Sequence, residues 1–278
     1  MSTSAASAPI RDSAIQAALA SSVRPPAPGP LSTSLTFGWR ALLKIKHIPE
    51  QLLDVTLFPV MFTLLFTFLF GGALAGSTVD YVQFLVPGMI VQSVLLITMY
   101  TGMTLRTDVE RGVFDRFRSL PVWRPSPIVG MLLGDAVRFA TAATATGLLG
   151  LALGWRPQGG LVGVSLAVLL LLVFAFGLGW VWTFLGLVLR SSSAVMSASM
   201  MVMMPLTFAS NIFVDPATMP GWLRAFVDVN PVSPLVTSVR ALVAGTGVGP
   251  QLAYTLTWAA LLVAVFGSLT MWRYRRAR

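Results

Sequence analysis

The chain has 278 residues, of which 55 % are hydrophobic and only 10 % are charged, and its mean hydropathy is +0.79. Soluble domains have about 25 % charged residues, so this composition excludes an ordinary soluble globular protein and indicates a membrane protein. The net charge is +9, yet we expect no nucleic-acid partner, because the basic residues lie at the ends of apolar segments, where anionic lipid headgroups attract them. The absence of cysteine excludes disulfides and thiolate metal sites.

Six apolar segments predict an all-α, polytopic membrane protein. A spanning helix needs about 20 mostly apolar residues, because each residue rises about 1.5 Å and the hydrocarbon core is about 30 Å thick. The segments that meet this length are Val55–Ala75, Tyr81–Leu105, Pro127–Gly154, Leu161–Leu189, Ser191–Val214 and Gln251–Trp272.

The basic residues predict that both termini are cytoplasmic. Of the 19 Lys and Arg residues, 15 precede the first segment or follow the second, fourth or sixth, and only Arg156, Arg224 and Arg240 fall on the other side. Basic residues are retained in the cytoplasm, and an even number of spans requires both termini on one side. We therefore expect a multi-pass protein of the cell membrane. The preference for Arg over Lys suggests a GC-rich, bacterial genome.

The N-terminal region divides into a tail and a helix. Residues 1–30 are rich in Ala, Ser and Pro, which predicts a disordered cytoplasmic tail and leaves 31–278 as one transmembrane domain. Leu31–His47 predicts an amphipathic helix, with one face that carries Thr36, Arg40, Lys44 and His47 and another that carries Leu35, Trp39 and Leu42. Such a helix lies in the inner membrane interface or packs on other cytosolic parts.

The long connection between the fifth and sixth segments contains two apolar pieces, Gly221–Val227 and Leu235–Val243. Both are too short to span a bilayer, so we expect re-entrant or interfacial helices there.

The segment Arg106–Pro121 follows the second span. Val109, Val113 and Phe117 recur every four residues, which predicts a helix with an apolar stripe. Such a stripe docks into a groove on a partner protein or lies on the membrane surface. Gly112 would cost about 1 kcal/mol inside a helix, so we expect a turn or a close backbone contact there.

Four sequence stretches resemble type-2 ABC export permeases, and within that family the daunorubicin-resistance and nodulation-export branch. They are VERGVFDRFRSLPV after the second span, IPEQLLDVTLFPVMFTLLFTFLFGGAL around the first, YVQFLVPGMIVQS opening the second and NPVSPLVTSVRAL before the sixth. The similarity runs from about residue 35 to residue 278 in the family's order.

The resemblance implies a dimer of permease chains, as a homodimer or heterodimer, that carries two copies of a separate cytosolic ATPase with MgATP bound to that partner. It also implies that the loop after the second span is the coupling helix that contacts the ATPase. The residues of this loop that match the family are Glu110, Arg111, Gly112, Phe114, Asp115, Phe117, Arg118, Leu120 and Pro121.

The sequence contains few residues that could bind ATP, relay protons, hold a metal or catalyse a reaction. No G-x-x-x-x-G-K followed by Ser or Thr occurs, so this chain has no phosphate-binding P-loop and is not expected to be the ATPase or any other enzyme. Within the spans, Asp135 is the main titratable group, and Arg138 follows it on the same helical face. We expect a structural ion pair there rather than a proton relay. His47 is the single histidine, which excludes a histidine metal site or a catalytic triad.

The fifth segment combines methionines with hydroxyl and amide side chains. Methionine is flexible and polarizable and suits varied apolar ligands, which makes Met200, Met204, Thr207 and Asn211 candidates for lining a substrate route. Pro205 should kink this helix. Ordinary packing explains the same composition equally well.

The sequence therefore predicts the permease subunit of an ATP-driven exporter of a hydrophobic, drug-like or lipid-like molecule, consistent with multidrug resistance. An exporter of glycolipid or polysaccharide precursors is the alternative within the family. An ion-coupled secondary transporter is disfavoured because the spans contain so little charge. A membrane enzyme lacks a convergent set of His, Asp and Glu residues.

Overall fold

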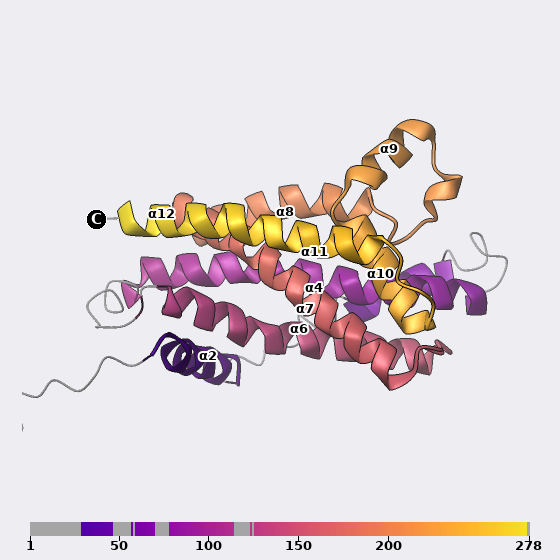
Figure 1. The fold of residues 1–278 in the computed structure, drawn as a ribbon, viewed down its shortest axis with the longest axis horizontal. Coiled ribbons are helices and arrows are strands. Elements are labelled where there is room, and N and C mark those ends of the chain that lie inside the picture. Colours follow the sequence, from indigo (N-terminus) through magenta and orange to yellow (C-terminus); the bar gives the residue numbers. More distant parts are fainter. Residues whose placement is uncertain are drawn as a thin grey trace, which may run out of the picture.

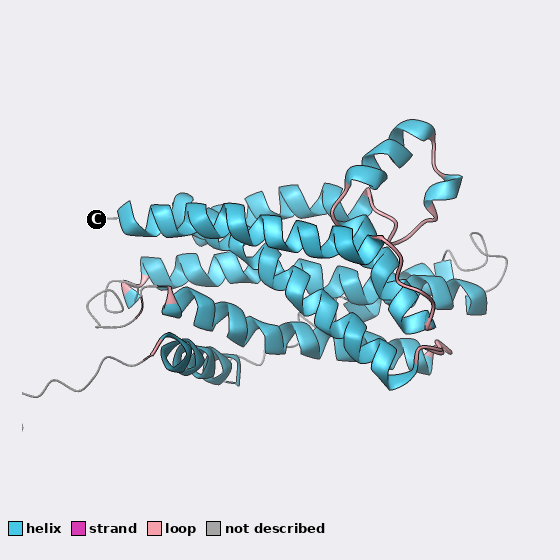
Figure 2. Cartoon of the chain, viewed as in Figure 1, coloured by secondary structure: helices cyan, strands magenta, loops and turns pink. Residues whose placement is uncertain are grey.

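The computed structural model describes residues 29–46, 57, 59–69, 78–113, 123 and 125–276, and within these ranges every regular element is a helix (Figure 2). The elements are α2 (Pro30–Lys46), α4 (Thr78–Glu110), α6 (Ser126–Ala152), α7 (Gly160–Val188), α8 (Ser192–Phe208), the 3-10 turn η1 (Pro216–Thr218), α9 (Gly221–Val229), α10 (Val232–Ala244), α11 (Gln251–Leu262), the π-helix η2 (Val263–Gly267) and α12 (Ser268–Arg276). A further short helix covers Pro59–Leu69. Figure 1 shows the long helices side by side in a bundle, with α2 beside α6 and α9 beyond one end.

Four helical stretches are long and apolar enough to cross a membrane, namely Asp80–Glu110, Ser126–Ala152, Gly160–Val188 and Gln251–Arg276, the last of which combines α11, η2 and α12. They confirm the second, third, fourth and sixth predicted spans. In the first predicted span, only Leu57 and the helix Pro59–Leu69 are described, and the rest lies outside the described residues. The predicted tail lies outside them as well, up to residue 28.

The fifth predicted span is shorter than the sequence suggests. The helix α8 has 17 residues, a length of about 26 Å, and it ends at Phe208 rather than at Val214. The side-chain amide of Asn230 donates hydrogen bonds to the carbonyl oxygens of Leu206 (2.8 Å) and Ala209 (2.7 Å). These carbonyls lie at the end of α8, where helical partners run out. The prediction of a helix up to Val214 is therefore wrong, because a distant side chain caps it earlier.

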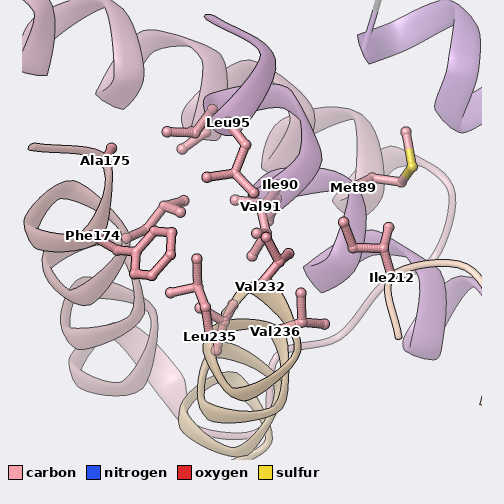
Figure 3. Packing of buried hydrophobic residues seen from close by; sticks show 14 of the residues in the cluster. Met89, Ile90, Val91, Leu95, Phe174, Ala175, Ile212, Val232, Leu235 and Val236 are labelled. Atoms are coloured by element: carbon pink, nitrogen blue, oxygen red, sulfur yellow. The ribbon is translucent and has the colours of Figure 1, made fainter. Parts of the chain in front are cut away.

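The centre of the bundle is α4, which packs against α6, α7, α8 and α10. Of its most apolar 18-residue stretch, 83 % is buried inside the chain. Figure 3 shows part of this core, where Leu95 and its neighbours on α4 meet Phe174 of α7 and Leu235 of α10. The helix α10 forms where the sequence predicted a short apolar helix, and its buried face completes the core around α4.

Three hydrogen bonds between buried side chains connect α4 to α6 and α7. The indole Nε1 of Trp182 in α7 donates to Thr98 Oγ1 (2.8 Å), and Thr146 Oγ1 in α6 donates to Ser93 Oγ (3.3 Å). Thr101 Oγ1 donates to Asp135 Oδ2 in α6 (2.7 Å). Lipid gives helices no hydrophobic reason to associate, so close packing and such polar contacts hold a membrane bundle together.

Glycines allow two close helix crossings. A Cβ atom at Gly102 of α4 would meet the backbone carbonyl of Trp182, and one at Gly186 of α7 would lie 2.7 Å from the carbonyl oxygen of Gly102. On α6, a Cβ at Gly130 would lie 2.6 Å from the carbonyl oxygen of Ser34 in α2. The glycines of α6 thus bring α2 onto the bundle.

The contact with α6 determines which face of α2 is free. The large apolar side chains left exposed on α2 are Leu31, Leu35, Trp39 and Leu43. They are spaced four residues apart and therefore form one apolar stripe. The structure thus places the small residues of α2 against α6 and its large apolar residues at the surface.

We expect Gly102→Ala to destabilise the bundle, because the added methyl group collides with backbone rather than with a movable side chain. Overpacking of this kind typically costs about 1–3 kcal/mol. Gly147→Ala in α6 is the matched control, because its Cβ would lie no closer than 3.8 Å to any neighbour. Thermal unfolding of the purified variants should show a lower midpoint for Gly102→Ala only. Equal midpoints for both variants and the parent would contradict a tight α4–α7 crossing.

Candidate coupling and substrate-lining sites

The last turn of α4 is tied to the start of α8 by Glu110. Its Oε1 pairs with Arg106 Nε (3.2 Å) and accepts a hydrogen bond from the backbone N–H of Ser192 (3.2 Å). Ser191 caps the same helix by accepting from the N–H of Ala194 (3.2 Å). A carboxylate beside unpaired N–H groups at a helix N-terminus is favourable. Glu110 therefore contacts both α4 and the start of α8.

The predicted helix Arg106–Pro121 does not continue through Gly112. The helix α4 ends at Glu110, and Arg111 and Gly112 form a turn in which Gly112 has a φ of +66°. The backbone of a residue with a side chain rarely adopts this left-handed conformation, whereas that of glycine does so without strain. The expected turn at Gly112 is confirmed, and the segment from residue 114 to residue 122 lies outside the described residues.

Part of the predicted coupling set is described. Glu110 and Arg111 are exposed at this end of the bundle, and Gly112 is half-buried. The other members lie outside the described residues: Phe114, Asp115, Phe117, Arg118, Leu120 and Pro121.

Asp135 and Arg138 lie together in the interior of the bundle. Arg138 Nη1 donates to Asp135 Oδ1 (3.1 Å), and both side chains are buried. Thr101 supplies a hydrogen bond to the other carboxylate oxygen. A buried charge needs both an opposite charge and hydrogen bonds, and this site provides both at the contact of α4 with α6. Whether the pair has only a structural role stays a prediction.

The four candidates for substrate lining fall into two pairs. Met200 and Met204 are 41 % and 45 % exposed, and Met201 between them is 80 % exposed. Thr207 is fully buried and donates to the carbonyl of Met203 (2.8 Å). Asn211 is also buried, and its Nδ2 donates to Thr237 Oγ1 (2.8 Å). The methionines thus form an open face of α8, whereas Thr207 and Asn211 belong to the interior of this chain.

A stack of aromatic rings lies at the end of α8. The Phe213 ring stacks on Phe208 (centroids 5.2 Å apart) and on Phe66 (4.6 Å), which belongs to the helix Pro59–Leu69. Stacked aromatic pairs contribute about 0.5–1.5 kcal/mol beyond their buried area. The described part of the first predicted span is therefore packed against the end of α8.

Arg240 has a role that the sequence did not indicate. Counted above only as a basic residue outside the spans, it is partly buried in α10, where its guanidinium donates to the carbonyl oxygens of Phe84 (3.1 Å), Asn211 (2.8 Å) and Ile212 (2.9 Å). It also lies 3.7 Å from the centre of the Phe84 ring. Burial lowers the pKa of Arg240 to about 10, an effect that Asp215 and Tyr81 oppose.

The guanidinium of Arg240 thus holds the irregular connection after α8 against α4 and α10. Its planar fork suits several carbonyls at once. The sequence signal was an arginine within an otherwise apolar helical piece, where an uncompensated charge is unfavourable.

Comparison with known proteins places the whole architecture in one family. Residues 34–243 match the ABC-2 type transporter family. The chain is 46 % identical to the daunorubicin resistance ABC transporter permease protein DrrB1 of Streptomyces coeruleorubidus, over 94 % of this chain and 92 % of that protein. It is 24 % identical to the doxorubicin resistance ABC transporter permease protein DrrB of Mycobacterium tuberculosis, over 75 % and 74 % of the two chains. These matches confirm the resemblance to ABC export permeases, and the chain belongs to the ABC-2 type transporter family as a multi-pass membrane permease.

Proposed function

We propose that this chain is the permease subunit of an ATP-driven exporter that moves hydrophobic, drug-like molecules out of a bacterial cell. The observation that supports this most directly is the 46 % identity, over nearly the whole chain, to a permease named for daunorubicin resistance. The relatives from Mycobacterium tuberculosis, whose names refer to doxorubicin resistance, favour a drug over a glycolipid or polysaccharide precursor. An amphipathic anthracycline is accordingly the substrate class to test first.

An ABC-2 permease implies an ABC ATPase partner. We infer two copies of that ATPase per complex, each with MgATP, docked at the end of the bundle where α4 terminates. The segment after Glu110 is the proposed docking site, with Phe114 and Phe117 filling a groove on the ATPase. Because Glu110 contacts both Arg106 in α4 and the start of α8, movement of the docked segment is expected to reach these two helices first.

The proposed substrate route lies between two permease chains whose α8 helices face each other. The exposed methionines of α8 support this position, because their flexible side chains accommodate apolar molecules of varied shape. In the same arrangement both termini are cytoplasmic, and α2 lies in the inner interface with its stripe of Leu31, Leu35, Trp39 and Leu43 toward lipid. The helices α9 and α10 are then re-entrant or interfacial elements at the outer mouth.

Asp135→Asn tests whether transport depends on ATP or on a proton gradient. The substitution weakens a buried ion pair, so we expect less folded protein. The daunorubicin accumulation that remains in inverted membrane vesicles containing the chain and its ATPase should still require hydrolysable ATP. Accumulation driven by a proton gradient without nucleotide, and abolished by Asp135→Asn, would instead identify an ion-coupled transporter.

Phe117→Ala tests docking of the ATPase. Burial of a large apolar side chain stabilises by roughly 1.5–3 kcal/mol, so assembly with the ATPase should weaken by roughly 10- to 100-fold, as measured by titration of the purified subunits. Phe226→Ala in α9, at the opposite end of the bundle, is the matched control because Phe226 is 50 % exposed. Undiminished assembly of Phe117→Ala would place the docking site elsewhere.

Met200→Trp and Met204→Trp test the substrate route. Each adds bulk to the open face of α8, so export should fall several-fold while expression and ATPase assembly stay unchanged. Leu148→Trp on α6 provides a control, because Leu148 is 61 % exposed on a helix outside the proposed route. Normal export by both methionine variants would show that this face of α8 is not the route.

A further inference from the structure

Two surface grooves join along one side of the bundle. The first, of about 690 Å³, lies between the start of α6, α7 and α12, and its lining includes Trp123, Val129, Trp180, Trp272, Arg275 and Arg276. The second, of about 580 Å³, lies between α6, α7 and α11 and is lined almost entirely by apolar side chains such as Leu132, Phe176 and Leu256. Val263 lines both. The two grooves therefore adjoin at Val263, and the surface along them is basic at one end and apolar toward the middle of the bundle.

A change in helix geometry occurs where the two parts meet. Residues Val263–Gly267 form the π-helix η2, and π-bulges occur frequently at functional sites. Gly267 lies beside Trp180, where a Cβ would approach the indole ring to 3.7 Å. The sixth span thus presents backbone rather than a side chain to the floor of the groove.

Among the described residues, the basic end of the groove has no acidic partner. Its lining contains two arginines and no acidic residue, and in the described part of the chain neither Arg275 nor Arg276 has an ion-pair partner. Arg276 lies 4.2 Å from the centre of the Trp272 ring, a cation–π contact that orients it. Trp123 and Trp272 are both about half exposed, as is usual for tryptophans at the level of lipid headgroups.

Trp180 forms part of the groove wall. Its side chain is 6 % exposed, and its indole nitrogen is enclosed by the described residues. Trp180 therefore contributes apolar ring surface to the groove.

The dimensions match those of a lipid. From Val263 to Arg276 the helix rises about 20 Å, slightly more than the hydrocarbon thickness of one leaflet, which is half of about 30 Å. A headgroup at Arg276 therefore allows an acyl chain to follow the groove to Val263 and end in its apolar part.

We propose that this groove binds one anionic phospholipid from the leaflet that surrounds the C-terminal end of α12. The phosphate lies between Arg275 and Arg276, the glycerol ester region lies near Trp180, and one acyl chain extends past Val263 between α6, α7 and α11. The lipid occupies a side of the bundle lined by α6, α7, α11 and α12, not by the methionine face of α8, so it is separate from the proposed substrate route. It would hold the sixth span against α6 and α7.

Binding can be measured on the full-length purified permease by native mass spectrometry. We expect phosphatidylglycerol to bind at least tenfold more tightly than phosphatidylcholine with the same acyl chains. Attraction to anionic headgroups is worth about 1 kcal/mol per basic residue, so the double substitution Arg275→Ala and Arg276→Ala should weaken binding of phosphatidylglycerol by roughly 30-fold. The same positions changed to Lys should retain most of the affinity.

Arg273→Ala is the matched control, because it removes the same charge from the same helical turn but Arg273 does not line the groove. Equal binding of the two lipids, or an equal loss on Arg273→Ala, would overturn the site. Binding of tail-free glycerol phosphate as tight as that of phosphatidylglycerol would also overturn it, by showing a phosphate site with no role for the apolar groove.

Discussion

The close crossing of α4 with α7 is the contact on which the remaining packing depends. At Gly102 the backbone of α4 touches the backbone of α7 at Trp182, and the Trp182 indole donates to Thr98 one turn earlier. In a membrane, helices associate through such short approaches and hydrogen bonds, because apolar surface gains nothing by leaving lipid for protein. A bulkier residue at Gly102 would separate the helices and lengthen the hydrogen bond as well.

Because α4 is fixed in this way, its two ends become attachment points for the less regular parts of the chain. At one end Glu110 joins α4 to the first turn of α8. Near the other end the Phe84 carbonyl and ring hold the guanidinium of Arg240, which also binds the carbonyls of Asn211 and Ile212. The helix α8 is thus attached to α4 before it starts and after it ends, while its methionine face stays open. This arrangement suits a transporter, because one helix exposes a deformable surface while its ends follow the central helix.

Sequence patterns predicted the parts of this structure that depend on local chemistry. The length of the apolar segments identified four spans, and the conformational freedom of glycine identified the turn at Gly112. The same patterns failed where a distant residue decides the outcome. The composition of the fifth segment favours a helix to Val214, but Asn230 caps it at Phe208. Only the fold shows that Thr207 is fully buried and bonds to its own helix; its role in lining a substrate route stays a prediction.

The sequence by itself determined that this is an all-helical membrane permease, because hydropathy, charge distribution and family motifs are properties of consecutive residues. The sequence also shows where each arginine lies along the chain, but not which groups it contacts in the fold. Only the tertiary structure decided that Arg240 binds three backbone carbonyls and that Arg275 and Arg276 face a groove while Arg273 does not. The physical reason is that burial and hydrogen-bond geometry depend on how helices far apart in the chain are rotated against one another. That rotation is set by a few contacts, such as Gly102 with Trp182, rather than by any local pattern.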